Sequence, residues 1–116
     1  MVIGIGIDLV KSERIKEVAQ KWGERFLTRI FTPLEQDYSF AHKHPYLHLA
    51  GRFAIKEAVF KAIGNDPKIT WKDIKISHDN DGRPVCLYPR KKLKRRILIS
   101  ISHTKHYAVA SAIITS

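Results

Sequence analysis

The sequence contains a single cysteine, Cys86, and no run of apolar residues long enough to cross a membrane. One cysteine excludes both an intramolecular disulfide and a zinc site built from several thiolates. A membrane-spanning helix needs roughly 20 consecutive apolar residues. The apolar start, Met1–Val10, lacks the length and the basic leader of a signal peptide and is interrupted by Asp8. We therefore expect a soluble protein of the reducing cytoplasm.

Acidic residues are also scarce, since the chain has 11 of them against 21 lysines and arginines and a formal net charge of +10. A positive charge of this size favours association with anions whatever the fold. Nucleic acid, an acidic protein, phosphorylated small molecules and anionic membranes all remain open as partners on this ground. With 116 residues, 44% of them hydrophobic, the chain is expected to form one compact domain, residues 1–116.

The familiar nucleotide-binding loops are absent from the sequence. Gly4-Ile5-Gly6 lacks the third glycine of the dinucleotide fingerprint and lies within a predicted strand, not at a strand-to-helix turn. A phosphate-cradling loop, with its glycines followed by lysine and a hydroxyl residue, is missing as well. A nucleotide would therefore be bound by neither of these folds.

The chain is predicted to begin with one strand and a helix. Val2–Ile7 alternates aliphatic residues with two glycines, which indicates a buried strand that another backbone, chain or ligand approaches closely. This strand is expected to end at Asp8. Apolar residues then recur at helical spacing up to Trp22, and Ser12 is the expected cap of that helix.

Two further helices follow. Thr32-Pro33-Leu34-Glu35 places threonine at the cap, proline at the first helical position and glutamate where it completes a capping box, so a short helix to about Phe40 is expected. Pro45 begins a third helix, which runs to Ile63 and stops at Gly64.

The second half of the chain has the period of strands. Two antiparallel pairs are predicted: Asp73–Ser77 with Pro84–Tyr88 across the turn at residues 79–82, and Ile97–Ser102 with Tyr107–Ile114. A short basic helix is expected between them, at Pro89–Arg96. The fold class is therefore α+β, with a largely antiparallel sheet packed with three main helices.

Asp8 is a candidate for metal binding because it follows a strand of small and aliphatic residues. A hard cation such as Mg²⁺ prefers oxygen ligands and takes only one or two carboxylates, which leaves places for water and phosphate. The alternative is that Asp8 caps the loop or helix that follows. From position alone the capping role is favoured.

The third helix carries a carboxylate and a lysine on one face, because Glu57 and Lys61 are four residues apart. Arg52 and Lys56 have the same relation on a neighbouring face. A carboxylate beside a lysine on an otherwise apolar helix suits a metal ligand next to a phosphate-binding cation. A solvated salt bridge worth a few tenths of a kcal/mol remains open as the alternative.

His103 ends a strand in Ser100-Ile101-Ser102-His103-Thr104, where it is placed to bind phosphate or transfer protons. A turn histidine bonded to the local backbone is the more common case. The other histidines have no comparable context, and no histidine or acid spacing indicates zinc. They are His42, His44, His48, His78 and His106.

Taken in order, four segments resemble the holo-[acyl-carrier-protein] synthase family of 4′-phosphopantetheinyl transferases. They are Gly4-Ile5-Gly6-Ile7-Asp8-Leu9-Val10, Phe31-Thr32-Pro33-Leu34-Glu35, Leu49-Ala50-Gly51-Arg52-Phe53-Ala54-Ile55-Lys56-Glu57-Ala58 and Ser100-Ile101-Ser102-His103-Thr104. The resemblance implies Mg²⁺-dependent transfer of phosphopantetheine from coenzyme A to a serine of acyl carrier protein, for fatty acid synthesis. It also implies a small homotrimer with active sites between subunits, and neither nucleic acid nor membrane as partner.

The resemblance further implies roles for individual residues. Asp8 and Glu57 match the metal-binding carboxylates, and Lys61 matches the lysine that contacts the donor phosphates. Arg52 and His103 match positions near coenzyme A. The first helix of the family presents basic residues to the carrier protein, and the candidates here are Arg14, Lys21 and Arg25.

Two other functions remain open at this point. The basic run Arg90-Lys91-Lys92-Leu93-Lys94-Arg95-Arg96 fits a non-catalytic nucleic-acid-binding domain, since such clusters neutralise phosphates, although a solvated surface is the default explanation. A related transferase that loads carrier domains of larger synthases is the second alternative. Many of those are pseudo-dimers in a longer chain.

Overall fold

The computed structural model describes residues 1–64, 66–89, 91 and 93–116. Its elements, in chain order, are β1 (Val2–Lys11), α1 (Ser12–Trp22), α2 (Glu24–Ile30), α3 (Pro33–Phe40), α4 (Pro45–Ile63), the 3₁₀ helix η1 (Trp71–Asp73), β2 (Lys75–His78), β3 (Pro84–Leu87), β4 (Arg96–His103) and β5 (Tyr107–Thr115). This order confirms the predicted α+β class, with four α-helices in place of three.

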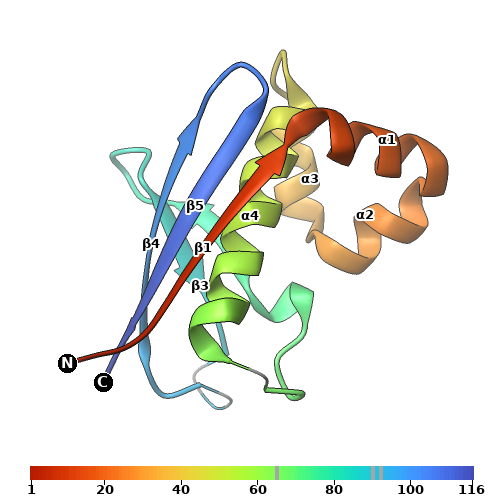
Figure 1. The fold of residues 1–116 in the computed structure, drawn as a ribbon. Helices are drawn as coiled ribbons and strands as arrows, with labels where there is room; N and C mark the ends of the chain where they lie inside the picture. The colour runs from red at the N-terminus through yellow and green to blue at the C-terminus, as the bar shows by residue number, and fades with distance from the viewer. Residues whose placement is uncertain (65, 90, 92) are drawn as a thin grey trace.

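The main sheet has three strands in the order β1-β5-β4, all antiparallel, and β2 and β3 form a separate antiparallel hairpin. Figure 1 shows α4 lying along one face of the main sheet, while α1 and α2 extend to the side. Small side chains of β5 cover the sheet side of this contact, since Ala108, Ala110 and Ala112 are fully or almost fully buried. The core therefore lies between α4 and the sheet.

Gly4 and Gly6 let the edge strand approach α4 at backbone distance. A Cβ at Gly4 would lie 2.1 Å from the carbonyl oxygen of Ala62, and one at Gly6 would lie 1.9 Å from that of Ala58. Real Cβ atoms do not approach backbone this closely. The expected close approach at these glycines is therefore confirmed, and the partner is the backbone of α4.

The opposite face of the sheet carries the alternate, aliphatic residues of β1. Along β1, Ile5, Ile7 and Leu9 point away from α4 and are 72%, 64% and 63% exposed. Successive strand residues point to opposite faces, so this row of large apolar side chains is a consequence of the register that turns Gly4, Gly6 and Asp8 toward α4.

The local signals of α3 and α4 predicted both helices correctly. Thr32 accepts a hydrogen bond from the Glu35 N–H, and the Glu35 carboxylate accepts one from the Thr32 N–H, which completes the capping box. Gly64, at φ 86°, ends α4 by donating its N–H to the carbonyl of Phe60. A left-handed backbone of this kind favours glycine.

Glu35 also has a role that the sequence did not predict. Its carboxylate is buried, lies 2.8 Å from the Lys56 Nζ and accepts the N–H of Ile76. Lys56 donates in addition to the carbonyls of Ile30 and Trp71. This ion pair joins α3, α4 and β2. Because all of its polar groups are bonded within the protein, its role is to hold these elements together.

Two expectations about the elements were wrong. β1 does not end at Asp8, because its pairing with β5 continues to Lys11 opposite Tyr107. Ser12 does not cap α1: Lys11 holds the cap position, and Ser12 binds the His106 carbonyl through its N–H and its hydroxyl. The first helix stops at Trp22, as its apolar spacing predicted, whereas α2 was not predicted.

The expected helix at Pro89–Arg96 is also absent from its described residues. Arg90 and Lys92 lie outside the described part of the chain, and Lys91 lies in a turn. The Leu93 N–H donates to the Pro89 carbonyl, and β4 already begins at Arg96.

Candidate active site

Asp8 lies on the face of β1 that is turned toward α4. Its carboxylate is 3.2 Å from the Nζ of Lys61, which also donates to the carbonyl of Ile7 at 2.9 Å. Position alone favoured a capping role for Asp8. That expectation was wrong, because Asp8 does not cap the following helix. The Asp8–Lys61 pair is partly exposed and contributes at most about 1 kcal/mol to stability. A role in binding a charged ligand therefore explains the arrangement better than a role in stabilising the fold.

Glu57 lies one helical turn before Lys61 and shares a cleft with Asp8 and Arg14. Burial raises the pKa of Glu57, the negative charge of Asp8 raises it further, and Lys61 opposes both effects. Lys61 pairs with Asp8, and no Glu57–Lys61 ion pair occurs among the described residues. The geometry therefore brings together two carboxylates and one ammonium, from β1 and α4.

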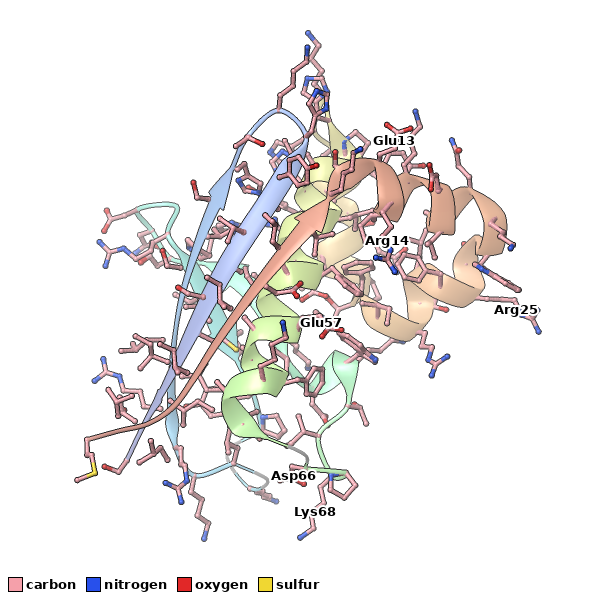
Figure 2. All side chains as sticks on the ribbon, viewed as in Figure 1. Glu13, Arg14, Arg25, Glu57, Asp66 and Lys68 are labelled. Atoms are coloured by element: carbon pink, nitrogen blue, oxygen red, sulfur yellow. The ribbon has the colours of Figure 1, made fainter. Side chains whose placement is uncertain are left out.

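A second cleft continues from Glu57 toward the end of α4. It is lined by Glu57, Phe60, Lys61, Gly64, Asp66 and Pro67. Figure 2 shows Glu57 on the side of α4 that also faces Arg14, with Asp66 and Lys68 beyond the end of the helix. Glu57 therefore lines both clefts, and Lys61 lines the second one.

The two carboxylates fit a single divalent cation. Their mutual repulsion, visible in the raised pKa of Glu57, is the effect that a bound cation would relieve. Mg²⁺ takes one or two carboxylates and completes its shell with water and phosphate oxygens. Within the described residues no group of three or more histidines, cysteines and acids is gathered for a metal.

Arg52 and His103 are not brought to these residues within one chain. Nine residues separate Arg52 from Lys61, which places them about 180° apart around α4. His103 lies on β4, at the opposite edge of the main sheet from Asp8, with β5 between them. Neither Arg52 nor His103 lines the clefts of Glu57. The predicted site is therefore divided between two sides of the molecule.

The predicted docking residues also occupy different places. Arg14 lines the cleft of Asp8 and Glu57, whereas Arg25 extends outward in Figure 2. Arg25 belongs to α2 and not to the first helix, because Gly23 at φ 56° separates the two. The Nζ of Lys21 lies 5.3 Å from the ring of Trp22.

The sequence did not predict the groove beside these cations. It is lined by Val18, Trp22, Arg25, Phe26, Arg29, Ile30 and Trp71, and Trp22 is half exposed. Apolar rings are combined here with two arginines, which suits a partner with an apolar ridge and acidic flanks. The exposed tryptophan at the end of the first helix was the available signal.

Histidines without context in the sequence are gathered on the Arg52 side. His48 lies within 4.3 Å of His42 and 6.2 Å of His103, measured between ring centroids. Arg52 donates to the carbonyl of His48, and its guanidinium lies 3.3 Å from the ring of His78. The cluster was not predicted because its members come from segments far apart in the chain.

Comparison with known proteins places the whole chain in one group. A family model described as the 4′-phosphopantetheinyl transferase superfamily matches residues 4–112. The holo-[acyl-carrier-protein] synthase of Thermodesulfovibrio yellowstonii is 47% identical over 115 residues, covering 99% of this chain and 100% of that protein.

Solved structures agree with this assignment. The holo-[acyl-carrier-protein] synthase of Neisseria meningitidis matches with a TM-score of 0.89 at 31% identity, covering 100% of both chains. The Bacillus anthracis enzyme in complex with CoA (3′,5′-ADP) matches with a TM-score of 0.85 at 33% identity, over 98% of this chain and 96% of that one. Similarity of this extent leaves no substantial segment unmatched.

Proposed function

Because the chain belongs to the 4′-phosphopantetheinyl transferase superfamily, we infer that it is a holo-[acyl-carrier-protein] synthase. It transfers 4′-phosphopantetheine from coenzyme A to a serine of apo-acyl carrier protein and leaves adenosine 3′,5′-bisphosphate. This reaction serves fatty acid synthesis. The observation that carries the mechanism is the meeting of Asp8, Glu57 and Lys61 where β1 crosses α4.

Asp8 and Glu57 are proposed to hold Mg²⁺. When bound, the ion would neutralise charge that develops on the pyrophosphate during transfer. The support is the pair of carboxylates that share one cleft and repel each other. Lys61 is free to exchange its contact with Asp8 for a donor phosphate, because the present ion pair is half exposed on the lysine side.

Glu57 is also the proposed proton acceptor. The serine oxygen attacks the phosphorus that bears pantetheine, the bond from that phosphorus to the bridging oxygen breaks, and the electron pair leaves with adenosine 3′,5′-bisphosphate. The serine proton passes to Glu57 or to a water that Glu57 orients. A pKa above the ordinary value makes this carboxylate a better base than an exposed glutamate.

The proposal includes a homotrimer with its sites between subunits. Two observations support assembly: the exposed row Ile5, Ile7 and Leu9 on the open face of the sheet, and the division of the site between opposite sides of α4. In a closed ring of identical contacts, one subunit supplies Asp8, Glu57 and Lys61 while a second copy supplies Arg52 and His103. Assembly also covers the apolar row.

Acyl carrier protein is proposed to dock along Arg14, Lys21 and Arg25. Their charge suits an acidic partner, and the groove between Trp22 and Phe26 offers apolar contact beside them. Arg14 connects this surface to the catalytic cleft.

No helix within the described ranges is long and apolar enough to cross a membrane. The proposal places the reaction in the cytoplasm, where a lone thiol such as Cys86 stays reduced.

Mass spectrometry of apo-acyl carrier protein tests the activity. The carrier is incubated with the protein, coenzyme A and Mg²⁺, and we expect it to gain the mass of one phosphopantetheine. The gain should disappear when the metal is chelated and return when Mg²⁺ is restored. No mass gain, together with tight and salt-sensitive binding of nucleic acid, would instead support the nucleic-acid alternative.

A further inference from the structure

A buried ion pair connects Glu35 of α3 with Lys56 of α4. The Lys56 Nζ lies 2.8 Å from Glu35 Oε1, and the side chains of Lys56 and Glu35 are 0% and 1% exposed. An ammonium group has three N–H donors, and Lys56 donates the other two to the carbonyls of Ile30 at 2.8 Å and Trp71 at 3.1 Å. Lys56 therefore has no donor left for a ligand or for water.

The Glu35 carboxylate is bonded at both oxygens. Its Oε1 accepts the N–H of Thr32 as well as Lys56, and its Oε2 accepts the N–H of Ile76 at 2.7 Å. The pair thus joins α4 to the last residue of α2, the cap of α3, the 3₁₀ helix η1 and the strand β2. A buried polar network in which every group is satisfied makes the surrounding core rigid.

The two carbonyls that Lys56 binds belong to the groove proposed for the carrier protein. Ile30 and Trp71 both line that groove, beside Arg25 and Arg29. Arg29 directly precedes Ile30 in α2, so a bond that fixes the Ile30 carbonyl also fixes the backbone of this arginine. Lys56 therefore holds residues of the groove, although its own side chain is fully buried.

The same helix carries Glu57, the proposed proton acceptor, which directly follows Lys56. The Trp71 ring stacks on Phe53, with centroids 5.4 Å apart, and meets Phe60 edge-on at 5.0 Å. Phe53 and Phe60 each line one of the two clefts of Glu57. The groove and the proposed catalytic carboxylate are therefore connected through α4, by hydrogen bonds and by aromatic contacts.

Stability alone does not explain a charged pair at this place. The cost of taking two charges out of water is comparable to the attraction between them, and a buried ion pair can often be replaced by apolar residues without loss of stability. The pair does supply geometry, because its bonds to Ile30 and Trp71 have defined lengths and directions. Such geometry matters where two surfaces must keep a set separation.

We propose that Lys56 and Glu35 are positioning residues for the transfer reaction, which hold the groove of Ile30 and Trp71 at a set distance from Glu57, so that a docked carrier protein brings its serine to the carboxylate. The inference rests on the proposed function. Neither residue touches a substrate, since both are buried and act through the backbone. Loss of the pair therefore impairs the reaction of the carrier protein and leaves the binding of coenzyme A unchanged.

Replacement of both charges tests this role. Lys56→Met combined with Glu35→Gln removes the ion pair without leaving one buried charge alone, and Lys75→Met, on the exposed side of β2, is the matched control. Transfer is measured per folded molecule at varied carrier concentration, and coenzyme A binding is measured by calorimetry with Mg²⁺. We expect kcat/KM for the carrier to fall by about tenfold or more, because a misplacement of roughly 1 Å can cost about 100-fold. The dissociation constant of coenzyme A should not change, and the control should match the unmodified protein in both assays.

Tryptophan fluorescence reports on the groove independently of the chemistry. The chain has two tryptophans, Trp22 and Trp71, and both line the groove. A carrier protein without tryptophan should change their emission when it docks on the unmodified protein. In the double variant we expect the same change to need a several-fold higher carrier concentration.

A uniform loss of function would contradict the proposal. If coenzyme A binding weakens as much as the carrier constants, the pair supports only the general fold, and if the carrier kinetics and the fluorescence titration are both unchanged, it positions nothing. If the double variant does not fold, Glu35→Asp, which keeps the charge and moves it by one methylene, decides between the same outcomes. Absence of transfer by the unmodified protein would instead count against the proposed function itself.

Discussion

At the scale of single residues, the site depends on how one carboxylate is placed. Glu57 has Asp8 across the cleft and Lys61 one turn along α4, and its raised pKa shows that burial and Asp8 outweigh the lysine. The metal binding and proton acceptance proposed for Glu57 both need its ionised form. The amide of glutamine keeps the shape of the side chain and would remove both proposed functions.

We predict that Glu57→Gln lowers kcat by about 100-fold or more, because general base catalysis alone contributes about 10²- to 10⁴-fold. Rapid mixing under conditions where chemistry limits the rate is the measurement. In the unchanged protein the rate should rise with pH through the Glu57 pKa, above the ordinary value of 4.5. Asp81→Asn, in the exposed hairpin turn, is the matched control. Full turnover with retained metal binding in Glu57→Gln would remove the residue from both roles.

At the scale of elements, the contact of β1 with α4 sets the site geometry. Asp8 follows Gly6 by two residues on the same face of the strand, and Glu57 precedes Ala58, whose carbonyl Gly6 approaches. The distance between the two carboxylates is therefore determined by how closely the glycines of β1 allow this strand to pack on α4.

Gly6→Ala is expected to weaken both folding and catalysis. Its Cβ would lie 1.9 Å from the Ala58 carbonyl oxygen, so β1 must move away from α4, at a cost of about 1–3 kcal/mol. Gly82→Ala, at φ 78° in the hairpin turn, is a control that strains the backbone away from the site. Urea denaturation should show a loss of stability in both variants. Only Gly6→Ala should lower kcat per folded molecule, and a normal kcat there would show that the site tolerates the shift.

The same scale shows what the sequence could and could not predict. The capping box of α3 and the proline and glycine limits of α4 are local signals, and both helices were predicted correctly. The extension of β1 past Asp8 depends on pairing with β5, almost a full chain length away. The histidines around Arg52 likewise come from three elements and a connector. Motif order predicted the candidate site residues, but only the fold shows that they lie on two sides of α4.

At the scale of the whole molecule, the net charge of +10 includes the three cations of the proposed carrier-protein surface, Arg14, Lys21 and Arg25. We predict that the Michaelis constant for acyl carrier protein rises several-fold between low and physiological salt, because exposed charges are screened within about 8–10 Å. Arg25→Gln should reduce this dependence, while Arg83→Gln, in the hairpin, should not. Steady-state assays at several salt concentrations measure both, and a salt-independent constant would argue against docking on this surface.

The division of the site also predicts how inactive subunits behave when mixed. Glu57→Gln disables the side proposed to hold the metal, and His103→Ala disables the side proposed to contact the donor. In the proposed homotrimer, each variant alone should therefore be weakly active. In a trimer whose sites lie between neighbours, a site is intact when a subunit with Glu57 adjoins one with His103, which random mixing gives at about a quarter of the sites.

Co-expression or refolding of the two variants together should therefore restore about a quarter of the unmodified activity, measured as phosphopantetheine transfer. Ile5→Lys places a charge in the exposed apolar row of β1, and it should yield monomers by size-exclusion chromatography and abolish the restoration. If the complete site lies within one chain, no mixture regains activity, since every subunit carries one lesion. Restored transfer activity therefore distinguishes a site shared between subunits from a site within one chain.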